Sequence, residues 1–141
     1  MSFLFDAAFS DPDGVPPGHE FRVYVPDDSG RVLIPAYTSP GADLGPACEV
    51  GRGATGVAWA TGVRMIARGS EVGGDGALGA EGLPRRPRAV AAVPIRLPSG
   101  GTVGVLTASS SRDESFLASP EGIHMHSFLA AVAGEILSLA G

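Results

Sequence analysis

The stretch from Glu49 to Gly62 constrains the fold of this chain more than any other. It opens with glycines at positions 51, 53 and 56 and continues into a short apolar segment with the only tryptophan, Trp59. The spacing Gly-x-Gly-x-x-Gly matches the dinucleotide-binding fingerprint, but no sequence typical of a buried parallel strand precedes it and no crossover unit follows. We interpret the glycines as a tight turn into a short helix over residues 55–60, with Thr55 as its N-cap. Anion binding by the first helical amides is the alternative.

A hairpin precedes this stretch. Apolar residues at 21, 23 and 25 alternate with Arg22 and Tyr24, which predicts a strand with one buried face. The turn Asp27-Asp-Ser-Gly leads into a returning strand over residues 31–38. Pro35 has no backbone donor, so we expect this strand at or near a sheet edge.

A second hairpin and a helix follow the stretch. After a short extended piece at 64–67 and a glycine-rich loop over residues 69–88, two apolar strands at 89–97 and 102–109 flank a glycine turn. Their continuous apolar character indicates central strands, and Gly104 indicates a close backbone approach. The sequence Ser119-Pro-Glu is typical of a helix start. The apolar stripe of the helix consists of Met125, Leu129, Val132, Ile136 and Leu139.

Composition excludes several classes of protein. The 141 residues, 44% hydrophobic and 18% charged, are enough for one folded domain. A net charge of −5 argues against nonspecific nucleic-acid binding, and the single cysteine, Cys48, excludes an internal disulfide. All ten basic residues are arginines, which indicates the coding bias of a high-GC bacterium. The first residues lack a basic region and a long apolar run, so we expect no signal peptide, no membrane span and a cytoplasmic location.

Together these elements resemble a GAF domain, the small-molecule sensory module. The resemblance rests on Val50-Gly-Arg-Gly-Ala-Thr-Gly-Val-Ala, Thr61-Gly-Val, Ala92-Val-Pro-Ile, Thr102-Val-Gly-Val-Leu and Phe116. It implies an α+β fold of the GAF/PAS-like (profilin-like) kind. A central antiparallel sheet of five to six strands would carry the short helix and variable loop on one face and the long C-terminal helix on the other. Residues 1–19 would be an N-terminal extension and residues 20–141 the GAF-like domain.

The resemblance also implies a ligand pocket between the sheet and the short helix. The residues expected near it are Tyr37, Trp59, Arg64, Met65, Arg88, Val93 and Thr107. Arg64 and Arg88 would bind a polar or anionic ligand group, because guanidinium offers bidentate geometry. Alternatively, Trp59 is an ordinary core residue, and the two arginines are solvated charges on loops.

A GAF domain usually begins with a substantial amphipathic helix, and here only about seven residues could form one. The apolar surface left behind favours a homodimer through Leu129, Val132 and Ile136. His124 and His126 are two apart on a helix and so lie on different faces, which argues against a metal site. We expect no cofactor.

The residues argue against catalysis of the kinds known in GAF relatives. The chain resembles free methionine sulfoxide reductases at Val50-Gly-Arg-Gly but lacks their cysteine at residues 54–56, and Cys48 has no resolving partner. No cysteine follows residue 48, so a bilin could not attach covalently at the position used by bilin-binding relatives. The chain also has no asparagine and no lysine, so it lacks the Asn-Lys-Phe-Asp-Glu motif of cyclic-nucleotide-binding relatives. We therefore expect a non-catalytic module for small-molecule sensing or regulatory protein interaction, acting in trans in signal transduction or transcription regulation. A dimerisation module without ligand and a sulfoxide-reductase-like redox enzyme are the alternatives.

Overall fold

The computed structural model describes residues 19–39, 45, 47–68, 89–110, 117 and 119–140, and every structural statement below concerns these residues. They form six strands and two helices: β1 (His19–Pro26), β2 (Val32–Thr38), β3 (Cys48–Glu49), α2 (Gly53–Thr61), β4 (Met65–Arg68), β5 (Ala89–Arg96), β6 (Thr102–Ser110) and α3 (Pro120–Ala140).

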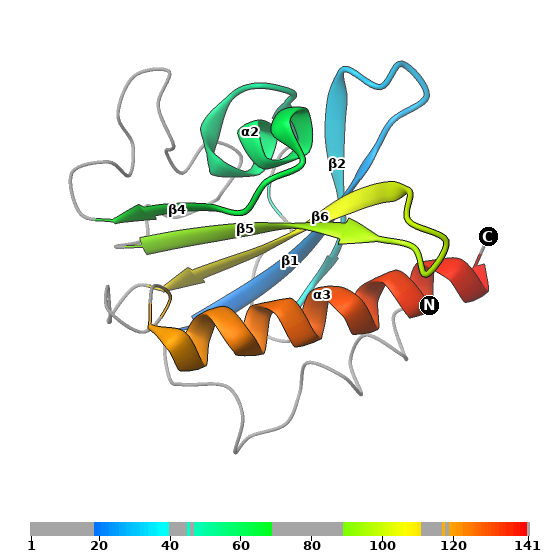
Figure 1. Ribbon diagram of the computed structural model, residues 1–141. Helices are drawn as coiled ribbons and strands as arrows, with labels where there is room; N and C mark the ends of the chain where they lie inside the picture. The colour runs from blue at the N-terminus through cyan, green and yellow to red at the C-terminus, as the bar shows by residue number, and fades with distance from the viewer. Residues whose placement is uncertain are drawn as a thin grey trace.

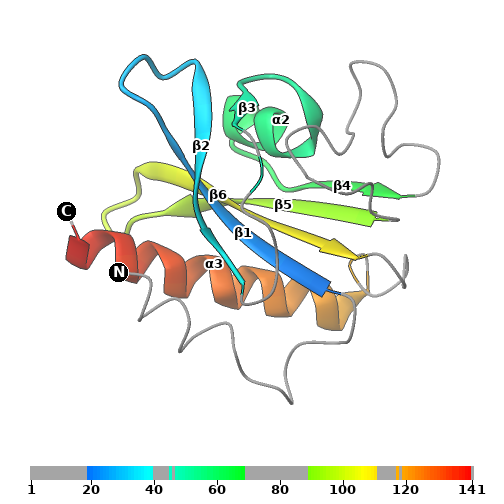
Figure 2. The same ribbon diagram turned by 180° about the vertical axis from the view of Figure 1, so that it is seen from behind.

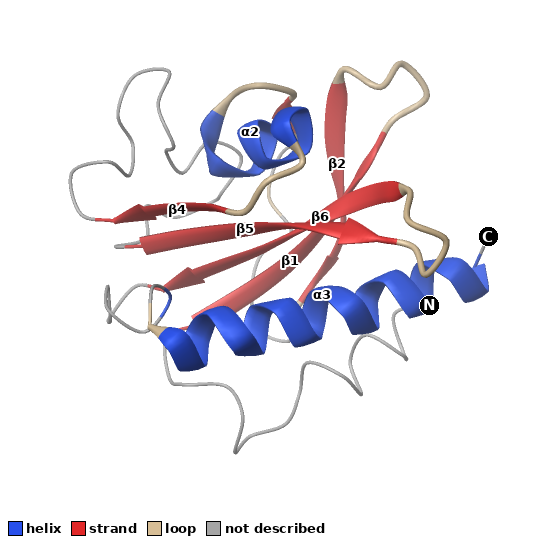
Figure 3. Ribbon diagram, viewed as in Figure 1, coloured by secondary structure: helices blue, strands red, loops and turns tan. Residues whose placement is uncertain are grey.

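The strands form one antiparallel sheet of six strands in the order β3-β2-β1-β6-β5-β4. The hairpins β1–β2 and β5–β6 meet where β1 pairs with β6 at the centre of the sheet. Helix α2 covers one face, and α3 runs across the other (Figures 1 and 2). Both predicted hairpins and the predicted α+β layering are therefore confirmed (Figure 3).

Local chemistry explains the first hairpin and its edge. The Asp27 carboxylate accepts hydrogen bonds from the Ser29 hydroxyl (2.7 Å) and the Gly30 amide (3.0 Å), and Gly30 takes the left-handed φ of 73° that the turn needs. Strand β3 pairs with Val32 and Leu33, so Pro35 lies where β2 has no outer strand neighbour among the described residues. This confirms the prediction that Pro35 marks a position near the sheet edge.

Both faces of the sheet are buried, which corrects the prediction of one buried face for β1. The core under α3 contains Phe21 and Val23 of β1, and a second core under α2 contains Tyr24. Arg22 and Tyr24, assigned from the alternation to the exposed face, are 1% and 0% exposed. Ala54 and Ala58 of α2 pack in the core on this second face.

Glycines allow two close approaches of backbone. A β-carbon at Gly104 of β6 would overlap the carbonyl oxygen of Tyr24 in β1, which confirms the predicted role of this glycine. A β-carbon at Gly134 of α3 would overlap the carbonyl oxygen of Arg96 in β5. Helix α3 therefore lies directly on the end of β5.

Helix α3 begins as the sequence predicts. The Ser119 hydroxyl accepts a hydrogen bond from the Gly122 amide at 3.1 Å, which is an N-cap interaction. Residues Pro120–Leu139 are long and apolar enough to cross a membrane by length and composition alone, with a mean hydropathy of 1.2. The apolar side of α3 packs in the core under the sheet, and core helices commonly pass the same test.

Candidate functional site

Helix α2 is positioned by the glycines that precede it. Gly51 and Gly53 have left-handed φ angles of 86° and 67°, and the Gly51 amide donates to the Gly56 carbonyl at 2.9 Å. A β-carbon at Gly56 would overlap the carbonyl oxygen of Glu49, so the helix can lie this close to the preceding strand only with glycine there. The interpretation of the glycines as a tight turn fits this geometry.

The predicted N-cap of this helix is wrong. Helix α2 begins at Gly53 and its N-cap position is Arg52, which makes no side-chain capping bond. Thr55 lies inside the first turn, and its hydroxyl hydrogen-bonds the hydroxyl of Thr107 in β6 at 2.6 Å. Both threonines are buried, so this bond ties the helix to the middle of the sheet.

Polar side chains continue from Thr107 across the α2 face of the sheet. Thr107 is the cross-strand partner of Arg22 in β1, and Arg22 is the partner of Thr38 in β2. Directly opposed residues of antiparallel strands point to the same face, so the three side chains form one row. The Glu20 carboxylate, half-buried, accepts a hydrogen bond from the Arg22 Nη2 at 2.9 Å. Glu20 in turn lies opposite the buried Ser109 of β6.

The row ends at Thr38, and Tyr24 borders it. The Thr38 hydroxyl is buried and has no hydrogen-bond partner among the described residues. Burial raises the pKa of Tyr24 far above its ordinary value, with a smaller contribution from the neighbouring Cys48 thiol. Cys48 itself is only 2% exposed. The α2 face thus combines a buried cation, its carboxylate partner and several hydroxyl groups, which we call the α2-face polar cluster: Glu20, Arg22, Thr38, Thr55, Thr107 and Ser109.

The residues predicted for the pocket lie on both faces of the sheet and not at one site. Trp59, Met65 and Thr107 lie on the α2 face. Tyr37 and Val93 lie in the core under α3 instead, and Arg64 reaches α3, where its Nη2 donates to the carbonyl of Ile123 at 3.2 Å and to the Ser127 hydroxyl. Arg88 lies outside the described residues.

The position of Tyr37 has a specific cause. Val23 pairs with Tyr37 and the next residue, Tyr24, pairs with Pro35, so Ala36 is an extra residue in β2. Such a bulge reverses the alternation and turns Tyr37 to the α3 face. The same bulge turns Thr38 toward Arg22. Arg22 was not predicted for the site because the alternation placed it opposite the buried face, and Glu20 lies just before the predicted strand. The available signal was an arginine flanked by apolar residues inside a strand.

The predicted dimer residues also need correction. Leu129 and Ile136 are each 6% exposed and pack against the sheet, and Val132 is half-buried beside them. They belong to the core of the protomer because α3 turns its widest apolar stripe inward. The exposed large apolar residues of α3 are Phe128 and Leu139.

His124 and His126 lie on different faces of α3, as predicted. His124 is exposed, whereas His126 is fully buried, with neither ring nitrogen hydrogen-bonded among the described residues. Desolvation, together with smaller contributions from the charges of Arg64 and His19, lowers the pKa of His126 to about 4. No group of three or more potential metal ligands occurs within the described part of the chain.

No protein-family model matches the chain, and no curated protein sequence is significantly similar to it. Solved structures are similar in fold. The type II free methionine-R-sulfoxide reductase from Thermoplasma acidophilum has 18% identity and a TM-score of 0.70, with coverage of 95% of this chain and 89% of that one. The GAF domain from Acinetobacter phosphoenolpyruvate-protein phosphotransferase has 14% identity and a TM-score of 0.62, with coverage of 86% and 71%.

A third structure is the free methionine-R-sulfoxide reductase from Neisseria meningitidis in complex with its substrate. It has 22% identity, a TM-score of 0.63 and coverage of 82% of this chain and 65% of that one. The chain thus spans slightly less than two thirds of this structure, and 62% of another GAF domain that it matches. The fold of the chain is GAF-like, as its sequence predicts.

These comparisons correct the expectation that the protein is not an enzyme. Four of the similar structures are free methionine-R-sulfoxide reductases, and one of them covers nearly the whole chain. The same fold therefore serves both sensory domains and enzymes. The absence of a cysteine at residues 54–56 is not sufficient to exclude catalysis.

Proposed function

We propose that residues 20–141 form a cytoplasmic sensory or regulatory module that binds a small polar molecule at the α2-face polar cluster. The observation that carries the proposal is Arg22, a charged side chain 1% exposed in the middle of a sheet. Removing a guanidinium from water costs several kcal/mol, and the Glu20 carboxylate beside it offsets part of this cost. Proteins commonly retain such groups where a ligand uses them.

The cluster favours a particular ligand chemistry. A guanidinium binds a carboxylate or phosphate through two parallel hydrogen bonds. Glu20 is an acceptor beside it and suits an ammonium group, and the Thr38 hydroxyl offers an additional donor and acceptor. We therefore infer a small zwitterionic or anionic molecule, such as a free amino acid or a derivative of one. The module would transmit its occupancy to a partner protein in trans.

Thermal-shift measurements with free amino acids, their sulfoxides, other small carboxylates and nucleotides test this proposal. We expect at least one class to raise the unfolding temperature of the wild-type protein and to lose this effect in Arg22→Met. The matched control is Arg31→Met, which removes an exposed arginine from the β1–β2 turn and should leave the shift unchanged. A panel without any shift, or a shift that survives in Arg22→Met, would overturn the proposal.

A second candidate function is thiol-dependent reduction of free methionine sulfoxide. It is favoured by the similar reductase structures and by Cys48, which lies in the same core as Tyr24 under α2. The Cys48 thiolate would attack the sulfoxide sulfur and take up its oxygen as a sulfenic acid, releasing methionine. Two molecules of an external thiol would then reduce the sulfenic acid, giving water and a disulfide.

This candidate has its own assay. Methionine release from free methionine-R-sulfoxide is measured with excess dithiothreitol, for the wild-type protein and for Cys48→Ser. Turnover that disappears in Cys48→Ser supports the activity. Ligand binding without turnover leaves the sensory proposal and removes the enzymatic one.

A further inference from the structure

The outward side of α3 and the adjoining end of β5 carry a groove, an exposed aromatic residue and several charged side chains that do not belong to the α2-face polar cluster. We propose that this surface is a two-fold dimer interface, in which Phe128 of each protomer enters a groove on the other.

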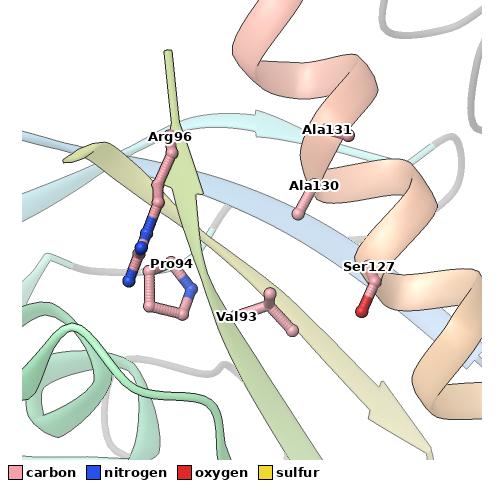
Figure 4. Close-up of a pocket in the computed structure, with 6 residues that line it drawn as sticks. All are labelled: Val93, Pro94, Arg96, Ser127, Ala130 and Ala131. Carbon is pink, nitrogen blue, oxygen red and sulfur yellow. The ribbon is translucent and has the colours of Figure 1, made fainter. Parts of the chain in front are cut away.

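The groove lies between β5 and α3 (Figure 4) and has a volume of about 210 Å³. Its walls are Val93, Pro94 and Arg96 of β5 and Ser127, Ala130 and Ala131 of α3. Strand β4 pairs with Ala89–Ala92, so within the described ranges the following residues of β5 have no β4 partner. Drug-sized ligands need roughly 300 Å³ or more, so a groove of this size suits a single large side chain.

Phe128 is a side chain of that kind. It is 63% exposed on α3, so its ring is available to a second molecule. Glu121 and Glu135 are also exposed and lie seven residues before and after it. Seven residues are about two helical turns, so the three side chains form a row with Phe128 between two carboxylates.

The groove has the opposite charge pattern. Arg96 lines it and donates from Nη2 to the carbonyl of Gly62 at 2.8 Å. Arg64 donates to the Ser127 hydroxyl on the other side of the groove, and its Nη1 is buried without a hydrogen-bond partner among the described residues. Neither arginine is paired with a carboxylate within the described part of the chain. The groove is therefore flanked by two guanidinium groups.

The row with Phe128 and the groove flanked by the two arginines are arranged for pairing with a second copy of the chain. Ala131 lines the groove and is also the i+3 neighbour of Phe128 on α3, so it separates the two features. Because it is small and exposed, a two-fold axis beside it allows two α3 helices to approach in antiparallel orientation. Each Phe128 then faces the partner's groove.

The charges fit the same arrangement. Arg64 lies beside Ile123, near the start of α3, and the backbone of Arg96 lies against Gly134. In an antiparallel pair, Glu135 of one protomer would lie toward the partner's Arg64, and Glu121 would lie toward the partner's Arg96. A second copy thus provides both the apolar side chain and the two carboxylates that this surface lacks.

Sedimentation velocity over a concentration series, from low micromolar to sub-millimolar, tests the proposal. We expect a monomer–dimer equilibrium whose dissociation constant rises roughly tenfold or more in Phe128→Ser, because central aromatic residues dominate interface energetics. The matched control is Ile34→Ser, which changes an apolar residue 45% exposed on β2 and should leave the equilibrium unchanged. Thermal unfolding of each variant verifies that it is folded.

A charge exchange gives the second measurement. Arg96→Glu and Glu121→Arg should each weaken the dimer, and the double variant should restore it while keeping the wild-type net charge of −5. A wild-type protein that stays monomeric throughout overturns the proposal. A dimer that is insensitive to Phe128→Ser, or a double variant no better than the single ones, overturns it equally, because association would then use another surface.

Discussion

His126 is an ionisable side chain held in an apolar site. Its ring is fully buried and makes an edge contact with Phe21, with ring centroids 6.0 Å apart. Arg64 and His19 are the positively charged or titratable groups whose charges act on it. A proton on His126 would therefore be desolvated and would be repelled by its neighbours.

This environment predicts an acid-sensitive fold. The pKa of His126 falls from 6.5 in an unfolded chain to about 4 in the folded protein. Below about pH 6.5 the unfolded state binds a proton that the folded state does not, so the free energy of unfolding falls as the pH falls, down to about pH 4. The total loss is about 3 kcal/mol for this one group.

Urea unfolding at neutral pH and at a pH between 4 and 5 measures this effect. His126→Met keeps an apolar side chain in the site and removes the titrating group. We expect its stability to depend less on pH in this interval than that of the wild type, whereas the exposed His124→Met should retain the wild-type dependence. Equal pH dependence in wild type and His126→Met would contradict the assignment.

Single residues also show where sequence reasoning failed. Arg22 and Tyr37 were assigned to the wrong environments for different reasons. The alternation in β1 is correct, but it cannot say whether a short helix such as α2 covers the second face. The extra residue Ala36 in β2 reverses the alternation at Tyr37, and nothing in the local composition indicates the bulge. These two positions decide the composition of the candidate site.

At the scale of elements, the bond between Thr55 and Thr107 joins α2 to the sheet. Thr55→Val leaves the buried Thr107 hydroxyl without its partner and should lower the free energy of unfolding by about 1–3 kcal/mol. The double variant Thr55→Val/Thr107→Val removes both hydroxyl groups and should cost less than the sum of the single changes. Urea unfolding of the four proteins measures the coupling, and additive effects would show that the two hydroxyls do not interact.

Helix α3 offers a second prediction, at Gly134. Helix propensity alone would make alanine there more favourable than glycine by about 1 kcal/mol. The added β-carbon would overlap the Arg96 carbonyl, so we expect Gly134→Ala instead to destabilise the protein by about 1–3 kcal/mol. Ser138→Ala, at an exposed position of the same helix, should be neutral or slightly stabilising. A stabilised Gly134→Ala protein would contradict the close packing of α3 on β5.

The elements themselves could be predicted well from the sequence, because their signals are local. The glycine turns between paired strands, Ser119 at the start of α3 and Pro35 near the sheet edge each have a physical cause within a few residues. The apolar stripe correctly predicted which side of α3 packs against the sheet. Leu129 and Ile136 are buried in that core, so they cannot also form a dimer interface. Phe128, which the sequence suggested would widen the stripe, and Leu139, within the stripe, are instead exposed.

At the scale of the whole molecule, the order of elements was sufficient to predict the GAF-like fold, although no sequence relative supports it. The choice between sensing and catalysis is not determined by the fold, since similar structures of both kinds exist. That choice depends on what occupies the α2-face polar cluster. Its members come from β1, β2, β6 and α2, so they become a site only when the sheet is assembled.

The most direct test of this account locates the bound molecule. Two-dimensional NMR of the protein titrated with the compound that gives the largest thermal shift measures chemical-shift changes residue by residue. We predict saturable changes at Arg22, Thr38 and Thr107, with none of comparable size around the groove between β5 and α3. Changes confined to that groove, or no saturable change with any member of the panel, would contradict the claim that the α2 face is the ligand site.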